Sequence, residues 1–166
     1  MQNKLVSRNF KMARPMMIAF GLLMASSFAW ADDAADTKCT NRTLNGDYGF
    51  TIEGVILALP GATIPPGGLP FRSVAMGHFD GKGKYTQVDH IVAGGAPPPV
   101  EWTVGSGPYT VNPDCTGKLV INVPGSPFSP VKLTFVVVRK GREIRTVVDP
   151  NGTSISATTS IGIKVE

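Results

Sequence analysis

The stretch from Gly107 to Ile121 reads GPYTVNPDCTGKLVI. Two short runs with apolar residues flank the polar centre NPDCTG, whose Asn, Pro, Asp and Gly residues favour a tight turn. On the C-terminal side, Leu119, Ile121 and Val123 alternate with other residues, which is the period of a β-strand with one buried face. The stretch therefore predicts a β-hairpin, with one of the chain's two cysteines, Cys115, in its turn.

The same unit of strand and turn recurs along the chain. Gly (19) and Pro (14) are frequent, and no later segment shows a sustained apolar period of 3.6 residues, so helix is nearly excluded. Eight expected strands at regular spacing favour an all-β fold, an eight-stranded antiparallel up-and-down barrel. Besides the set around Leu119, the side chains expected to face inward are Tyr48, Phe50, Ile52, Val131, Leu133, Phe135, Val137, Ile144, Thr146 and Val148.

Three segments bear on which side chains face inward. The final residues, SISATTSIGIKVE (154–166), alternate apolar with small polar residues and predict a half-buried strand. In the strand expected over residues 84–93, His90 shares the side of Val88 and Val92, so we expect His90 to point inward. Gly105 and Gly107 predict a bulge in the strand expected over residues 100–111.

The connectors between the expected strands are unequal. LALPGATIPPGGLP, GGAPPPV, PGSPFSP and DPNGT alternate along the chain with the short polar turns DGKGK, NPDCTG and RKGRE. In an up-and-down barrel, alternate connectors lie at the same end. We therefore expect three long Pro/Gly-rich loops and one turn around an open mouth, and three tight turns closing the other end.

The N-terminal segment has the pattern of a secretory signal. Four basic residues precede an apolar run from Met16 to about Trp30, and Ala29-Trp30-Ala31 matches a cleavage site. We predict a signal peptide over residues 1–31, an N-terminal segment over 32–46 and one β-barrel domain over 47–166. The product would be periplasmic or secreted, and its sequence contains no apolar stretch long enough for a transmembrane segment.

Charge argues against nucleic acid as a partner. The whole sequence carries a formal net charge of +4, but four of its sixteen Lys and Arg residues precede residue 32, and the remaining twelve balance twelve Asp and Glu. Binding to nucleic acid draws most of its affinity from neutralised phosphates, so a neutral mature chain does not favour it.

The two cysteines are expected to pair with each other. Cys115 lies in a turn at the closed end, and Cys39 precedes a strand that begins at the same end. Isolated cysteines of exported proteins usually form disulfides. Metal or nucleophile chemistry is the weaker alternative, because two thiols without a neighbouring His make a poor zinc site. We predict a Cys39–Cys115 disulfide.

The segments LNGDYGF, GHFDGKGKYT and GPYTVNPDCTGKLVI resemble, in that order, a family of small secreted bacterial proteins with a calycin-like, allene-oxide-cyclase-like barrel. The resemblance spans most of the mature chain. It implies the eight-stranded barrel and export. Members are mostly without an assigned activity, and the resemblance places no catalytic residue in this sequence.

No set of residues indicates catalysis, a metal or a cofactor. Glu53, Glu143, Arg145 and Asp149 are expected to face outward, and no two carboxylates converge. A basic group that combines Arg145 with Arg139, Lys140 and Arg142 is typical of a solvated turn, with binding to an anionic surface as the alternative.

The apolar character of the long connectors points to binding at the open end. We expect a non-catalytic binding module for a small hydrophobic ligand or a partner surface, with Trp102, Phe71 and Phe128 as contacts and His90 as the polar orienting group. One alternative is an isomerase or cyclase that acts on a hydrophobic substrate with His90 as its acid–base group. The other alternative is a surface interaction protein without a pocket.

Overall fold

The structure, a computed structural model, describes residues 38–150 and 155–166. The predicted signal peptide, residues 1–31, lies outside the described residues. Within the described part of the chain, no helix is both long and apolar enough to cross a membrane.

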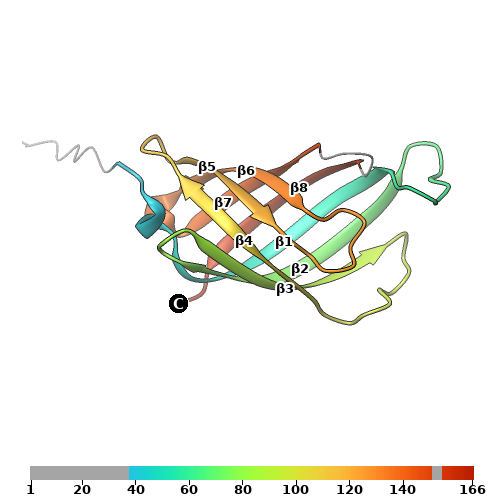
Figure 1. The fold of residues 1–166 in the computed structure, drawn as a ribbon, viewed down its shortest axis with the longest axis horizontal. Coiled ribbons are helices and arrows are strands. Elements are labelled where there is room, and N and C mark those ends of the chain that lie inside the picture. The colour runs from blue at the N-terminus through green and yellow to red at the C-terminus, as the bar shows by residue number, and fades with distance from the viewer. Residues whose placement is uncertain (1–37, 151–154) are drawn as a thin grey trace, which may run out of the picture. The chain divides into compact units, whose positions relative to one another are not determined.

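Eight antiparallel strands form a closed up-and-down barrel in which each strand pairs with its neighbours in sequence and β1 pairs with β8 (Figure 1). This confirms the predicted fold class. Two 3₁₀ turns, η1 and η2, lie at one end. The elements are η1 (Asn41–Thr43), β1 (Asn45–Ala58), β2 (Leu69–Asp80), β3 (Lys84–Ala93), β4 (Thr103–Val111), β5 (Thr116–Ile121), β6 (Val131–Val138), η2 (Arg139–Gly141), β7 (Glu143–Asp149) and β8 (Ile155–Lys164).

Aromatic side chains fill the barrel at the end with the short turns. The ring of Phe79 lies 4.6–5.3 Å, centroid to centroid, from the rings of Tyr48, Tyr85 and Tyr109. Leu44, which follows η1, is fully buried against this group. The hydroxyl of Tyr109 donates to the carbonyl of Leu44, and the hydroxyl of Tyr48 donates to the carbonyl of Gly141. This end of the barrel is therefore closed by packed side chains.

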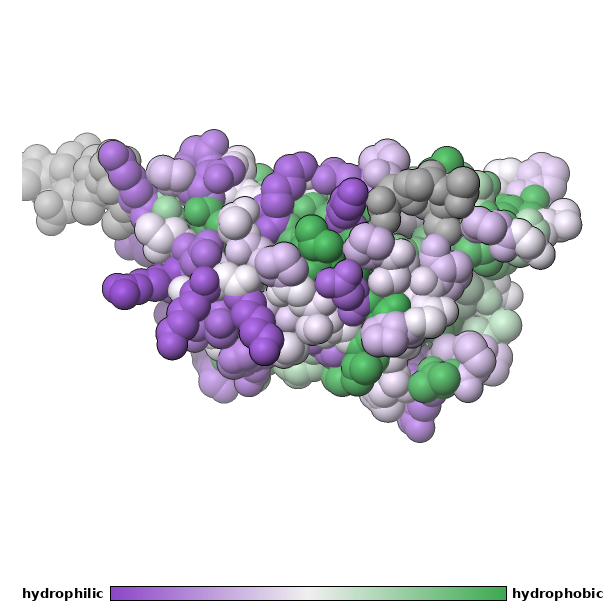
Figure 2. Space-filling model, viewed as in Figure 1, coloured by the Kyte–Doolittle hydropathy of each residue, from purple (hydrophilic) through white to green (hydrophobic). Residues whose placement is uncertain are grey.

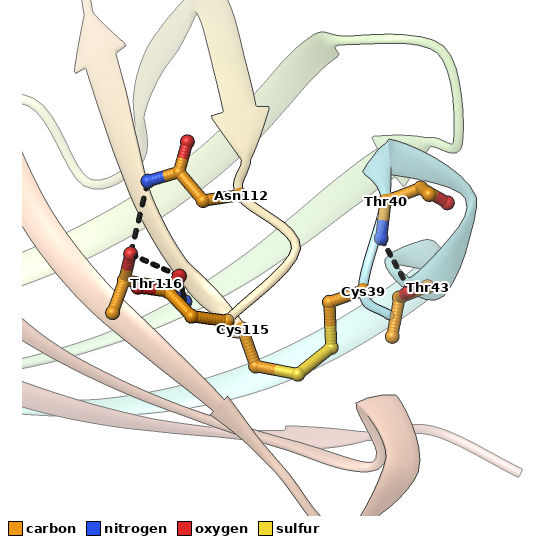
Figure 3. The surroundings of a disulfide bond; sticks show 7 residues. Cys39, Thr40, Thr43, Asn112, Cys115 and Thr116 are labelled. Atoms are coloured by element: carbon orange, nitrogen blue, oxygen red, sulfur yellow. Dashed lines mark hydrogen bonds between the residues drawn. A yellow bond between two sulfur atoms is a disulfide. The ribbon is translucent and has the colours of Figure 1, made fainter. Parts of the chain in front are cut away.

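The predicted disulfide joins Cys39 to Cys115 at the closed end, with Cα atoms 5.0 Å apart (Figure 3). Cys115 has a φ of 66° in a turn held by hydrogen bonds from the backbone N–H and the hydroxyl of Thr116 to Asp114 Oδ1. The backbone N–H of Cys39 also donates to the carbonyl of Pro113. The bond fastens the segment before β1 to the β4–β5 turn.

The expectation of a bulge at Gly105 and Gly107 is wrong. The pairing of β4 with β3 runs without a shift from Pro108 to Thr103. A Cβ on Gly107 would lie 1.9 Å from the carbonyl oxygen of Val120 on β5. Glycine is required there because two backbones approach closely, not because the strand contains an extra residue.

β8 places its small polar side inside the barrel. Thr158 and Ser160 are buried, whereas Ile161 and Ile163 are about half exposed on the outer surface. The strand is half-buried as predicted, but the polar side chains form its buried face. Inward positions on β8 next to Phe50 must be small, since a Cβ on Gly162 would lie 2.4 Å from that ring.

Glu143 does not face outward as expected, and its side chain is only 5% exposed. Its two carboxylate oxygens form ion pairs with Nε of Arg139 and Nε of Arg145 at 3.2 and 2.8 Å, and Arg145 also donates a hydrogen bond. Both arginine side chains remain exposed, whereas the carboxylate is buried. Two of the four residues in the predicted basic group are therefore paired within the protein, whereas Glu53 and Arg145 are exposed as expected.

Candidate functional site

A cavity of about 630 Å³ occupies the half of the barrel toward the long connectors. It begins above the packed aromatic group, where Tyr85 and Leu119 form part of its floor, and it extends to the loops between β3 and β4 and between β5 and β6. Tyr48, Phe79 and Tyr109 of the packed group do not line it. Most of the wall is apolar, contributed by Phe50, Ile52, Ile56, Phe71, Ile91, Ala93, Ile121, Val123, Val131, Leu133 and Val148.

Proline-rich loops form the rim of the cavity. Residues 96–100 after β3 and residues 124–128 after β5 line it. An antiparallel bridge joins Ala93 to Ala96, and the backbone N–H of Gly94 donates to the carbonyl of Pro70 at 2.8 Å. Proline fixes φ, so these loops hold their position with little conformational freedom.

One side of the wall, on β7 and β8, carries hydroxyl groups. Thr146 and Ser160 are 2.7 Å apart across the two strands, and Thr158 donates to Ser156 at 2.9 Å. All four residues line the cavity. Because these hydroxyls bond to one another, they give the wall a polar stripe without leaving their own groups unsatisfied.

The opposite side, on β3, carries a buried carboxylate. Asp89 lines the cavity, is only 6% exposed, and its Oδ1 has no hydrogen-bond partner. Burial raises the pKa of Asp89. Hydrogen bonds from Gln87 and from the backbone of Asp89 itself oppose this shift, and so does the charge of the nearby His90. Below it, the hydroxyl of Tyr85 donates to Gln87 at 3.0 Å. The other charged residues that line the cavity are Lys132 and Asp149, which was expected to face outward, and Asp149 is paired with Lys118. Within the described part of the chain, Asp89 is therefore an acidic group without an ion-pair partner in a mostly apolar wall.

Of the four predicted contacts, Phe71 and Phe128 line the cavity. Trp102 does not line it and is 49% exposed. The inward orientation expected for His90 is wrong. Its Nδ1 lies 2.6 Å from the carbonyl of Glu101, and its ring lies 5.7 Å from the ring of Trp102, on the outside of the barrel.

The predicted orientation of His90 is wrong because the outer surface of β3 also carries apolar residues. Val88 shares the side of His90, and this side faces out, leaving Val88 38% exposed. Tyr85, Asp89 and Ile91 form the inner face of β3. Every second residue of a strand faces the same side, so Asp89 shares the side of Tyr85, which the structure shows to be fully buried.

The described residues contain no cluster of three or more His, Cys, Asp or Glu side chains able to hold a metal ion. No protein-family profile and no curated protein matches the chain. Among solved structures, a redesigned β-barrel is similar at 13% sequence identity and a TM-score of 0.49, over 76% of this chain and 95% of that protein.

Proposed function

We propose that this protein is an exported, non-catalytic binding module that takes one small hydrophobic molecule into the barrel. The observation that carries the proposal is the cavity of about 630 Å³ with its apolar wall. Ligand sites are commonly concave, mostly apolar volumes of about 300–1,000 Å³ with a few polar groups. An eight-stranded barrel is wide enough to hold one small ligand in its interior.

The position of the cavity supports entry through the open end. The closed end is filled by Tyr48, Phe79 and Tyr109, whereas the cavity reaches the loops that contain Ala96 and Phe128. A ligand that enters between these loops buries its apolar surface against β-strands that already pair around the whole barrel. Binding therefore requires little reorganisation of the barrel, which limits the entropy lost on association.

Export is part of the same proposal. It draws on the apolar N-terminal segment and its cleavage pattern, on the resemblance to small secreted bacterial proteins with a calycin-like barrel, and on the Cys39–Cys115 disulfide. Disulfides persist in oxidising compartments such as the periplasm and the extracellular space. In that setting the protein would bind a hydrophobic molecule that dissolves poorly in water.

Binding of the neutral fluorophore N-phenyl-1-naphthylamine tests the proposal. Ala93 lines the rim of the cavity, so Ala93→Trp should reduce the affinity about tenfold or more by filling apolar space that the probe needs. Val88→Trp adds a comparable ring on the outer face of β3 and should leave the affinity unchanged. Circular dichroism of both variants checks that the barrel is intact. Equal affinities in the wild type and both variants would contradict binding inside the barrel.

A second candidate is an isomerase or cyclase that acts on a hydrophobic substrate. Asp89 favours it, because a carboxyl group with a raised pKa inside an apolar cavity suits proton transfer. His90, the acid–base group of the alternative drawn from the sequence, lies outside the cavity and would not serve. Chemical conversion of a bound hydrophobic compound that disappears in Asp89→Asn would favour this candidate over simple binding.

A further inference from the structure

We infer that the bound molecule is a hydrophobic amine whose protonated head group pairs with Asp89. This inference rests on the proposed function and adds the chemical class of the ligand. Asp89 is 6% exposed, lines the cavity, and has one oxygen without a partner. A buried polar atom without a partner is destabilising in the free protein, so a ligand that supplies the missing donor gains affinity from it.

The groups around Asp89 compensate its charge only in part. Ala75 on β2 and Thr103 on β4 are its paired neighbours, and neither is ionisable. The phenol of Tyr85 is a further weak acid, whose pKa is raised by burial and by the charge of Asp89. His90, on the other face of the same strand, is the one neighbour whose charge favours the carboxylate. Among the described residues, no Lys or Arg forms an ion pair with Asp89.

A ligand that fills the cavity removes water from this carboxylate, so the identity of its head group decides the binding free energy. An alkyl chain alone would leave the charge without solvent or partner, and a carboxylic acid would add a second acid beside it. A hydroxyl donates one hydrogen bond. A protonated amine donates a hydrogen bond and also supplies the opposite charge, which makes charge-assisted bonds about twice as strong as neutral ones.

The geometry allows the head group to enter first. Asp89 lies four residues from Ala93 at the rim, a distance of about 13 Å along an extended strand. The apolar wall on β1, β5 and β6, including Phe50, Ile121 and Leu133, surrounds the space above and beside it. The terminal torsion of an Asp side chain is broad, so the carboxylate can adjust its orientation toward a ligand in the cavity at low energy.

Displacement of N-phenyl-1-naphthylamine by decylamine, decanol and decanoic acid at neutral pH tests this inference. Decylamine should bind about tenfold or more tightly than decanol, the ratio expected for a hydrogen bond between charged groups. Asp89→Asn should remove that ratio while decanol affinity stays within about threefold. Glu53→Gln, which removes a carboxylate from the outer face of β1, is the matched control and should preserve the ratio.

The pH dependence gives an independent readout. Alkylamines stay protonated up to about pH 10, as Lys does. Asp89 loses its charge as pH falls through its raised pKa. In the wild type, the advantage of decylamine over decanol should therefore shrink as pH falls. In Asp89→Asn, it should be absent at every pH.

Each failure has a separate meaning. If the probe and all three decyl compounds fail to bind, the proposed function is wrong. If decanol or decanoic acid binds as tightly as decylamine, or if Asp89→Asn keeps the preference for the amine, the hydrophobic site stands and its assignment to amines is overturned.

Discussion

At the scale of single residues, the carboxylates of this protein divide by environment. Asp80 accepts hydrogen bonds from the backbone N–H groups of Lys82, Gly83 and Lys84, and these bonds hold the pKa of its carboxyl below the ordinary value. Asp149 has a lowered pKa because Lys118 bonds to it. Burial instead raises the pKa of Asp89. A role in ligand binding would explain why a destabilising carboxylate lies inside the cavity.

Asp89→Asn should therefore stabilise the free protein at neutral pH. The pKa of Asp89 in the folded protein lies above its unfolded value of 3.8, so the folded state binds the proton more tightly. The stability that Asp89 confers at low pH is therefore lost as pH rises through the folded pKa. We expect a gain of about 1–3 kcal/mol in the free energy of unfolding at pH 7, the size of the penalty for an unsatisfied buried polar group. The gain should be smaller at pH 4.

Urea unfolding of the wild type and the variant at both pH values measures this effect. Asp149→Asn is the control of opposite sign, because its lowered pKa means that the stability it confers is present at pH 7 and lost as pH falls. A gain from Asp89→Asn that is equal at pH 4 and pH 7 would show that desolvation of the charge is not its cause.

At the scale of the strands, the barrel matches large aromatic residues with glycines on adjacent strands. Gly117 of β5 pairs with Phe135 of β6, and Gly162 of β8 pairs with Phe50 of β1. A Cβ on Gly117 would lie 2.2 Å from the Phe135 ring. These glycines supply the volume that the aromatic rings occupy inside the barrel.

Gly117→Ala should therefore destabilise the barrel by about 1–3 kcal/mol, the usual effect of forcing an extra methyl group into a packed core. Gly49→Ala on β1 is the matched control. A Cβ there has no atom within 4 Å, so the change should stay within about 0.5 kcal/mol. Thermal melts of the two variants make the comparison. Equal losses in both would mean that strand propensity, not contact with Phe135, determines the effect.

At the scale of the whole barrel, the two ends have different roles. The disulfide, η1, η2 and the packed aromatic residues lie at the end with the short turns, and the cavity opens at the other. Hydrophilic side chains gather on the surface at the closed end in Figure 2, where Lys38, Arg42, Arg139, Lys140 and Arg142 are exposed. Stability elements are thus separated from the proposed binding site.

Loss of the disulfide should lower stability and leave binding unchanged. The bond links residues separated by 76 positions, and small exported domains lose about 2–5 kcal/mol without a native disulfide. We expect that loss in the Cys39→Ser/Cys115→Ser double variant by urea unfolding, with unchanged affinity for N-phenyl-1-naphthylamine in the folded protein. Reductant should have no further effect on the double variant.

Two results would contradict this separation. Mass analysis that finds two free thiols in the wild-type protein would remove the disulfide from the account. A double variant that stays folded but no longer binds the fluorophore would show that the closed end also shapes the cavity.

The sequence alone determined the strands, their order, the end at which the long loops gather and the disulfide. These features depend on local patterns: the turn around Cys115, the alternation from Leu133 to Val137, and the rule that antiparallel neighbours alternate in direction. Phe71 and Phe128 could also be placed near the cavity, because their position depends only on which connector they adjoin.

Only the tertiary structure decided which face of β3 and β8 is inside. Both faces of β3 carry apolar residues, and on β8 the polar face of Thr158 and Ser160 is the buried one, so alternation defines two sides without naming the inner one. Closure of the barrel makes that choice, because the space at the axis is limited. Large aromatic rings fill the axis at the closed end. At the open end, the wall with small hydroxyl side chains and Asp89 leaves the cavity that a ligand would fill.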